Sequence, residues 1–168
     1  MATNAQQDWA GAAQNAATDG EFKRDTTYIE DRIVASVTGD EPQPAAEGNG
    51  EVLHWPVQPD RYRLIAARAC PWAHRAVIVR RLMGLEDVIS LGLAGPTHDK
   101  RSWTFDLDPG QVDPVLKIPR LQDAYFKRFP AYPRGITVPS LVEVSSGKIV
   151  TNDSVSYTHL TLPTIYSV

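Results

Sequence analysis

One stretch strongly limits the folds open to this chain: an apolar run that is followed at once by a proline-led helix. The run from Tyr62 to Ala69 is typical of a buried strand, and apolar residues at helical spacing then continue to a stop at Gly84. A second apolar run, from Val88 to Leu93, predicts another strand. A strand–helix–strand unit of this length implies two parallel strands joined by a right-handed crossover.

The only cysteine of the chain, Cys70, lies between that strand and the helix expected over residues 71–83. Pro71 suits the first helical position, where its missing N–H costs nothing, so Cys70 is expected at or beside the helix N-cap. Unpaired amide N–H groups and the positive end of the helix dipole favour the thiolate there, and the thiolate is the nucleophile. The sequence therefore predicts a reactive sulfur.

Having one cysteine also limits the chemistry. In dithiol redox proteins a second cysteine stands three positions after the first, but this chain has Ala73 there. Any disulfide formed at Cys70 must therefore be resolved by an external thiol. The alternative is a structural role, because free cysteines are among the most buried residues. His74, one helical turn after Cys70, is likewise either a base for the sulfur or a structural residue.

Composition excludes several classes of function. The chain has 17 basic and 20 acidic residues, a net charge of −3, which gives no bias toward nucleic acid. No apolar run approaches the roughly 18 residues that span a bilayer, and the first residues do not resemble a secretory signal. The histidines lack ligand spacing, so no metal site is expected. Together with the single cysteine, these observations predict a cytoplasmic protein that contacts no membrane.

The chain divides by composition into four parts. Residues 1–20 are rich in Ala, Asn, Gln and Gly and are expected to be a flexible N-terminus. Residues 21–60 are an extension with apolar residues suited to docking, followed by a linker rich in Pro and Gly. Residues 61–154 are the expected folded domain. Residues 155–168 are Thr-rich, carry a central proline and lack helical spacing, so we interpret them as a foreign tail, an artefact of truncation or assembly.

The second half of the domain predicts a hairpin. Residues 137–144 are typical of a strand, a Ser-Ser-Gly turn follows, and residues 148–151 return as the partner strand. Most of residues 94–133 is expected to be loop, with 121–128 as a candidate helix. The order β-α-β, loop, β-β is the thioredoxin-like plan of the α/β class, in which a further helix is expected after the hairpin.

Several motifs together are similar to those of one enzyme family. They are Ala-Cys-Pro-Trp-Ala-His-Arg at 69–75, Leu-Glu-Asp-Val-Ile-Ser at 85–90, Ile-Thr-Val-Pro at 136–139 and Ile-Val-Thr-Asn-Asp-Ser at 149–154. Over about residues 20–154 the chain resembles the glutathionyl-hydroquinone reductases, the Xi class of glutathione transferases. The resemblance implies a glutathione-binding domain truncated before an all-helical C-terminal domain, which in the family supplies the hydroquinone pocket and the contacts of a homodimer.

The resemblance also implies a mechanism. The family's cysteine attacks the sulfur of a glutathionyl-hydroquinone, which gives a cysteine–glutathione mixed disulfide and free hydroquinone. A second glutathione then releases glutathione disulfide. Glutathione is thus a co-substrate, no metal takes part, and the expected partners are a small-molecule thiol and a hydroquinone conjugate.

Carried over to this chain, the resemblance makes Cys70 the nucleophile and places Trp103 at the border of the glutathione site. Val138, which precedes an expected cis-proline at Pro139, would pair through its backbone with the cysteinyl amide of glutathione. An extended segment before a proline suits such strand-type pairing on chemical grounds as well. Arg134 is a further candidate partner for a carboxylate.

The same resemblance makes Asp153 and Ser154 the partners of the γ-glutamyl amine and carboxylate. An acid, a hydroxyl and a helix start supply the atoms that such a charged group needs. The alternative is a plain helix N-cap without a ligand, because Asp and Ser are preferred there in any case. The family usually has glutamate at the position of Asp153, which leaves open a low-molecular-weight thiol other than glutathione.

Three functions follow from these observations. The first is a glutathionyl-hydroquinone reductase, represented by its thioredoxin-like half. The second is an omega-like glutathione-dependent thiol transferase that acts on small mixed disulfides. The third is a non-catalytic thiol-binding module or an inactive fragment.

Overall fold

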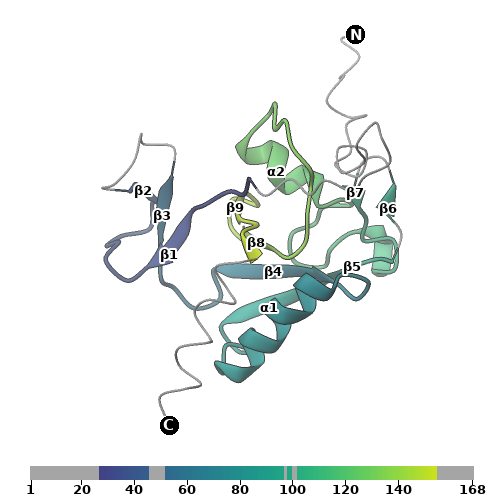
Figure 1. The fold of residues 1–168 in the computed structure, drawn as a ribbon, viewed down its shortest axis with the longest axis horizontal. Coiled ribbons are helices and arrows are strands. Elements are labelled where there is room, and N and C mark those ends of the chain that lie inside the picture. Colours follow the sequence, from purple (N-terminus) through teal and green to yellow (C-terminus); the bar gives the residue numbers. More distant parts are fainter. Residues whose placement is uncertain (1–26, 46–51, 97, 100–101, 155–168) are drawn as a thin grey trace.

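A four-stranded sheet in the order β5-β4-β8-β9 forms the centre of the computed structural model, which describes residues 27–45, 52–96, 98–99 and 102–154 (Figure 1). Strand β4 pairs in parallel with β5 and antiparallel with β8, and β8 pairs antiparallel with β9. The thioredoxin-like order predicted from the sequence is thereby confirmed. The strands are β4 (Tyr62–Ala67), β5 (Ile89–Ala94), β8 (Ser140–Glu143) and β9 (Ile149–Thr151).

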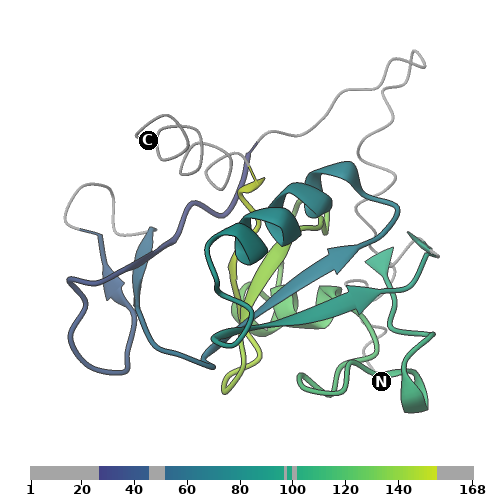
Figure 2. The same cartoon turned by 90° about the horizontal axis from the view of Figure 1, so that it is seen from below.

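Helices cover both faces of this sheet. Helix α1 (Pro71–Leu82) crosses one face and α2 (Gln122–Arg128) lies on the other (Figures 1 and 2). All six residues of β4 are buried, as expected for a strand that is covered on both faces. The described residues between β5 and α2 form short elements: β6 (His98–Asp99), β7 (Ser102–Trp103) and a 3₁₀ turn at Pro109–Gln111.

The extension before the domain is folded too. Strands β1 (Arg32–Val34), β2 (Gln43–Pro44) and β3 (Leu53–Pro56) form a separate sheet in the order β1-β3-β2. The sequence predicted docking for this region but a linker where β2 lies. Residues 43–44, in the stretch expected to be a linker or loop, form β2, which pairs antiparallel with β3.

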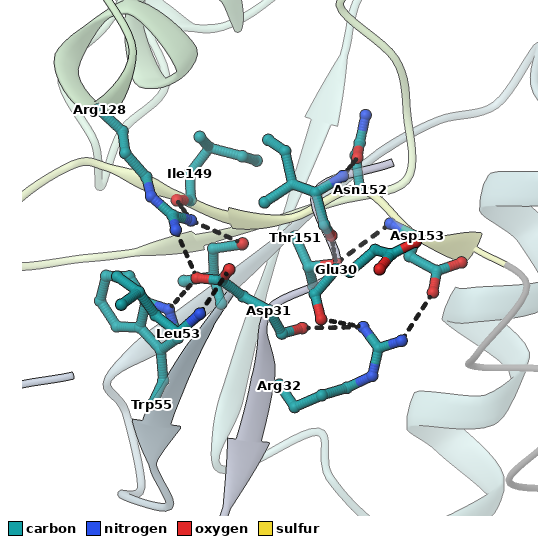
Figure 3. Close-up of polar contacts among 12 residues, drawn as sticks. Glu30, Asp31, Arg32, Leu53, Trp55, Arg128, Ile149, Thr151, Asn152 and Asp153 are labelled. Atoms are coloured by element: carbon teal, nitrogen blue, oxygen red, sulfur yellow. Dashed lines mark hydrogen bonds and ion pairs between the residues drawn. The ribbon is translucent and has the colours of Figure 1, made fainter. Parts of the chain in front are cut away.

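A buried carboxylate joins the extension to the domain (Figure 3). Asp31 is only 2% exposed, and its Oδ2 accepts hydrogen bonds from Arg128 Nη2 at 2.5 Å and from Trp55 Nε1 at 2.7 Å. Its Oδ1 accepts the backbone N–H of Leu53 at 3.0 Å. Arg128, at the end of α2, also donates to two backbone carbonyls of β9 at 3.0 Å each. Asp31 thus links β1 and β3 to α2 and β9.

Local pattern predicted the elements near Cys70 well and the first hairpin strand less well. The strand and helix boundaries of β4, α1 and β5 match expectation within about two residues, and the candidate helix is present as α2. The strand expected over 137–144 covers only Ser140–Glu143, because Pro139 has no N–H to donate to a ladder. Residues 1–20 and the tail 155–168 lie outside the described residues, so their expected states remain predictions.

Helix α1 turns apolar side chains outward. Trp72, Ile78 and Leu82 on the helix, and Met83 directly after it, are between 42% and 69% exposed. In the part of the chain that the structure describes, no helix has both the length and the apolar character needed to cross a bilayer.

A second buried ion pair supports the sheet from the loop after β5. Arg63, on β4, donates from Nε and Nη2 to Asp113 Oδ2 at 3.0 and 2.9 Å. Asp113 is fully buried, and its Oδ1 accepts the backbone N–H groups of Val115 and Leu116. One carboxylate therefore satisfies a guanidinium and a loop backbone together.

We predict that Asp113→Ala lowers the free energy of unfolding by about 3–5 kcal/mol, because it leaves the Arg63 guanidinium buried without its charge partner. Urea denaturation followed by tryptophan fluorescence measures the change. The control is Arg81→Gln, which removes an ion pair with Glu86 whose side chains are 70% and 50% exposed. That control is expected to cost no more than about 1 kcal/mol. Equal losses in the two variants would contradict the role given to Asp113.

Candidate active site

The sheet topology brings three separate chain segments to one end of the sheet. Strand β9 runs parallel to β4, because each is antiparallel to β8, so β4 and β9 finish at the end where β8 starts. Cys70 follows β4, Val138 and Pro139 precede β8, and residues 152–154 follow β9. Five of the predicted site residues thus lie at the same end of the sheet, although 84 positions separate Cys70 from Ser154 (154 minus 70).

Cys70 occupies the predicted position at the start of α1. It is the N-cap residue, with extended φ/ψ of −104° and 110°, and Pro71 begins the helix. Its carbonyl accepts the N–H of His74 at 3.2 Å, the first bond of the helix. The side chain is partly buried and packs against the main core, so it is neither fully enclosed nor fully exposed. This arrangement leaves the sulfur beside the unpaired amides of the helix start.

Val138 lies opposite the sulfur. The Cys70 Sγ is 3.5 Å from the Val138 carbonyl oxygen, and the peptide bond between Val138 and Pro139 is cis, as expected. No acceptor among the described residues takes the Val138 N–H. The backbone facing Cys70 thus has a donor available for an extended peptide, which is the property predicted for this segment.

A buried tyrosine fixes this loop, and sequence analysis missed it. Tyr125, on α2, is fully buried, and its hydroxyl contacts the Thr137 carbonyl at 3.1 Å and Ser140 Oγ at 2.9 Å. Burial raises the pKa of the Tyr125 phenol, so the hydroxyl stays protonated and can donate. The two bonded residues flank Val138 and Pro139. The phenol therefore holds the loop from both sides.

Residues after β9 bind the N-terminal extension. The Asn152 side chain accepts the Ile29 N–H at 2.9 Å and donates to Thr137 Oγ1 at 2.9 Å. Thr151 Oγ1 donates to the Ile29 carbonyl at 2.6 Å. The extension and the loop before Pro139 are thus joined through Asn152. No short-range sequence pattern predicts a bond between residues so far apart in the chain.

Asp153 and Ser154 are both buried, at 7% and 6% exposure. Asp153 Oδ2 accepts a hydrogen bond from Arg32 Nη2 at 3.2 Å, so the predicted acid has a cationic partner from β1 (Figure 3). Ser154 Oγ is buried and has no hydrogen-bond partner among the described residues. A buried hydroxyl without a partner is costly, and it is the kind of group that a ligand can satisfy.

The remaining two candidates lie in the loops that follow β5 and α2. Trp103 ends β7, is half-buried against the main core, and its carbonyl accepts the Leu121 N–H at 3.0 Å. Arg134 is half-buried in the loop that leads to Thr137. The roles assigned to both residues stay predictions.

Two further hollows lie apart from Cys70. A cavity of about 520 Å³ is lined by Trp55, Arg61, Glu143 and neighbouring residues, at the opposite end of the sheet. A groove of about 330 Å³ runs beside α1 and is lined by His74 and Val77 among others. Neither lining includes Cys70. Within the described ranges no three acidic, histidine or cysteine side chains gather as metal ligands would.

Comparison with known proteins identifies relatives of this site. The chain is 34% identical over 140 residues to the Escherichia coli glutathionyl-hydroquinone reductase YqjG, and the matched region covers 82% of the chain and 40% of that protein. It is also 34% identical over 140 residues to glutathione S-transferase omega-like 2 of Schizosaccharomyces pombe, with 83% and 40% covered. The chain therefore spans about 40% of the length of these relatives.

Solved structures agree. A glutathione transferase from Gordonia bronchialis is 60% identical, superposes with a TM-score of 0.68, and is matched over 83% of this chain and 40% of its own. The glutathione-bound structure of YqjG from Escherichia coli K-12 is 32% identical with a TM-score of 0.57, over 76% and 44%.

The family model for the glutathione S-transferase N-terminal domain matches residues 69–156, which begin directly before Cys70 and include the loop at Val138 and the residues after β9. The chain therefore belongs to the glutathione S-transferase family, and its resemblance to the glutathionyl-hydroquinone reductases is confirmed.

Proposed function

We propose that this chain provides the thiol-binding and nucleophilic part of a glutathione-dependent reductase that converts glutathionyl-hydroquinones to hydroquinones. The observation that carries the proposal is the position of Cys70 at the start of α1, 3.5 Å from the carbonyl of Val138. A sulfur beside a helix start and an extended backbone suits exchange with a peptide thiol. The glutathione-bound relative supports glutathione as that thiol.

The first step is attack of the Cys70 thiolate on the sulfur of the conjugate. An S–S bond forms, the bond between sulfur and the hydroquinone ring breaks, and the ring carbon takes the electron pair and a proton. The products are a Cys70–glutathione mixed disulfide and the free hydroquinone. The helix start stabilises the negative charge on sulfur before the attack.

The second step needs an external thiol, because the chain has no other cysteine. The thiolate of a second glutathione attacks the glutathionyl sulfur of the mixed disulfide and releases glutathione disulfide with the Cys70 thiolate. Val138 would hold the cysteinyl part of the tripeptide, Asp153 and Ser154 its γ-glutamyl end, and Trp103 and Arg134 would border it.

A second candidate has support from a relative. The similarity to an omega-like transferase favours a thiol transferase that removes glutathione from small mixed disulfides by the same sulfur exchange. A non-catalytic thiol-binding module, or an inactive fragment, is the candidate from another class. Cytoplasmic location and a homodimer of the whole protein remain proposals.

We predict that Cys70→Ser abolishes hydroquinone release from a glutathionyl-hydroquinone in excess glutathione, because oxygen cannot replace sulfur in the exchange. Intact-mass analysis after incubation with glutathione disulfide should show one glutathionyl group on the native chain and none on the variant. The matched control is His74→Asn. We expect it to retain hydroquinone release within about tenfold, whereas loss of a general base costs about 10²–10⁴.

The outcomes separate the candidates. Release that survives Cys70→Ser would rule out both enzyme proposals. Adduct formation with turnover only of small mixed disulfides would favour the transferase. If the native chain forms no adduct and releases no hydroquinone, the module or the inactive fragment would be favoured.

We also predict that Tyr125→Phe slows formation of the Cys70–glutathione adduct, because the loop at Val138 loses the hydroxyl that holds both its ends. The free energy of unfolding should fall by about 1–3 kcal/mol. The matched control is Tyr62→Phe, which removes a buried hydroxyl bonded to the Pro56 carbonyl. Tyr62 lies at the start of β4, at the other end of the sheet from Cys70. That control should lose stability while adduct formation keeps its rate. Equal rates in both variants would refute the positioning role of Tyr125.

A further inference from the structure

Arg32, which contacts Asp153, comes from outside the family domain. Arg32 begins β1, 37 positions before the matched domain starts at residue 69 (69 minus 32). Its Nη1 donates to the carbonyls of Glu30 at 2.6 Å and Asp31 at 3.0 Å, and its Nη2 donates to Asp153 Oδ2 at 3.2 Å. These bonds fix the guanidinium at the end of β9 (Figure 3).

Neighbouring contacts set the position of Arg32 firmly. The residue before it is Asp31, whose buried carboxylate is bonded to Arg128, Trp55 and Leu53. Ile29, three positions before it, is bonded through its N–H and its carbonyl to the side chains of Asn152 and Thr151. The backbone that carries Arg32 is thus attached to β9 through Ile29, and to β3 through Asp31 and the parallel pairing of β1 with β3.

We propose that Arg32 is a specificity-determining residue that binds the α-carboxylate of the γ-glutamyl end of the thiol substrate. The proposal deepens the proposed function and rests on it. The γ-glutamyl end is a zwitterion, with an α-ammonium and an α-carboxylate on one carbon. An adjoining aspartate and arginine match those two charges, with the ammonium at Asp153 and the carboxylate at Arg32.

Exposure and burial fit this division of roles. The Arg32 side chain is 42% exposed, so a ligand carboxylate can approach it, whereas the Asp153 side chain beside it is 9% exposed. Ser154 Oγ, the buried hydroxyl without a partner next to Asp153, is a further donor for the same ligand. The class of substrate selected is a thiol with a free α-amino-acid end.

A purely structural latch between β1 and β9 is the competing explanation of the ion pair. The two explanations differ in what they say about ligands. A latch affects the binding of all ligands alike, whereas a carboxylate partner affects only those that carry the α-carboxylate. The ratio of affinities for matched ligands within one protein variant therefore separates them.

The experiment is isothermal titration calorimetry with three S-methylated tripeptides, whose sulfur cannot react with Cys70. S-methylglutathione carries both charges of the γ-glutamyl end. The 4-aminobutanoyl analogue of that tripeptide lacks only the α-carboxylate, and the glutaryl analogue lacks only the amine. Each is titrated into the native chain, Arg32→Gln, Arg32→Lys and the control Arg81→Gln, which removes an exposed positive charge from α1.

We expect the native chain and Arg81→Gln to bind S-methylglutathione about tenfold or more tightly than the 4-aminobutanoyl analogue, as for a charge-assisted hydrogen bond. In Arg32→Gln that preference should fall to about onefold, while the preference over the glutaryl analogue persists. Arg32→Lys should restore part of the preference. Because each preference is a ratio within one variant, a partly unfolded sample does not change it.

The proposal would be overturned by equal binding of S-methylglutathione and the 4-aminobutanoyl analogue by the native chain, or by an unchanged preference in Arg32→Gln. No binding of S-methylglutathione to the native chain would overturn it as well. The proposed function is scored separately, by the Cys70 adduct and hydroquinone release. An adduct that forms while the calorimetry fails leaves the chemistry of Cys70 standing and removes only the role of Arg32.

Discussion

The buried carboxylate of Asp31 is the contact on which the arrangement of this molecule depends. It accepts hydrogen bonds from a guanidinium of α2, an indole of β3 and a backbone amide of the same strand. Removing one partner of such a group leaves an uncompensated buried charge, which costs about 3–5 kcal/mol. Because Arg128 is also bonded to the carbonyls of β9, Asp31 joins the small sheet β1-β3-β2 to the central sheet. The extension is therefore part of the structure that carries the thiol site.

The site itself follows from sheet topology and is refined by two polar side chains. Parallel alignment of β4 and β9 brings Cys70 and Asp153 to one end of the sheet, and the segment before β8 adds Val138. Tyr125 then holds the Val138 loop from inside the core, while Asn152 joins that loop to the extension. Each contact uses a partly buried hydrogen bond, which is favourable only when both partners are correctly placed. The same bonds that stabilise this end of the sheet thus determine the geometry around the sulfur.

Sequence alone predicted what depends on local pattern. The Cys-Pro step between an apolar strand and a helix located Cys70 at the N-cap, and the spacing of apolar residues gave β4, α1 and β5. The first strand of the hairpin was predicted too long, because its apolar residues continue through a proline that cannot join the ladder.

The contacts of the extension could not be predicted in the same way. Arg32 and Asp153 are 121 positions apart, and Asp31 and Arg128 are 97 apart, so no short-range periodicity connects them. One local signal was present: adjacent Asp31 and Arg32 stand between the apolar residues Ile29 and Ile33, where charges are retained only if they have partners. That signal indicates burial with a partner, but it does not say which partner.

Amide hydrogen exchange at Ile29, which is bonded to the Asn152 side chain, tests most directly whether the extension is held to the thiol site by Asp31. The account predicts protection of the Ile29 amide in the native chain that approaches that of the β4 amides. In Asp31→Asn, protection at Ile29 should fall sharply while the β4 amides keep theirs. Exchange of the native Ile29 amide at the rate of an unfolded chain, or protection that Asp31→Asn leaves unchanged, would contradict the account.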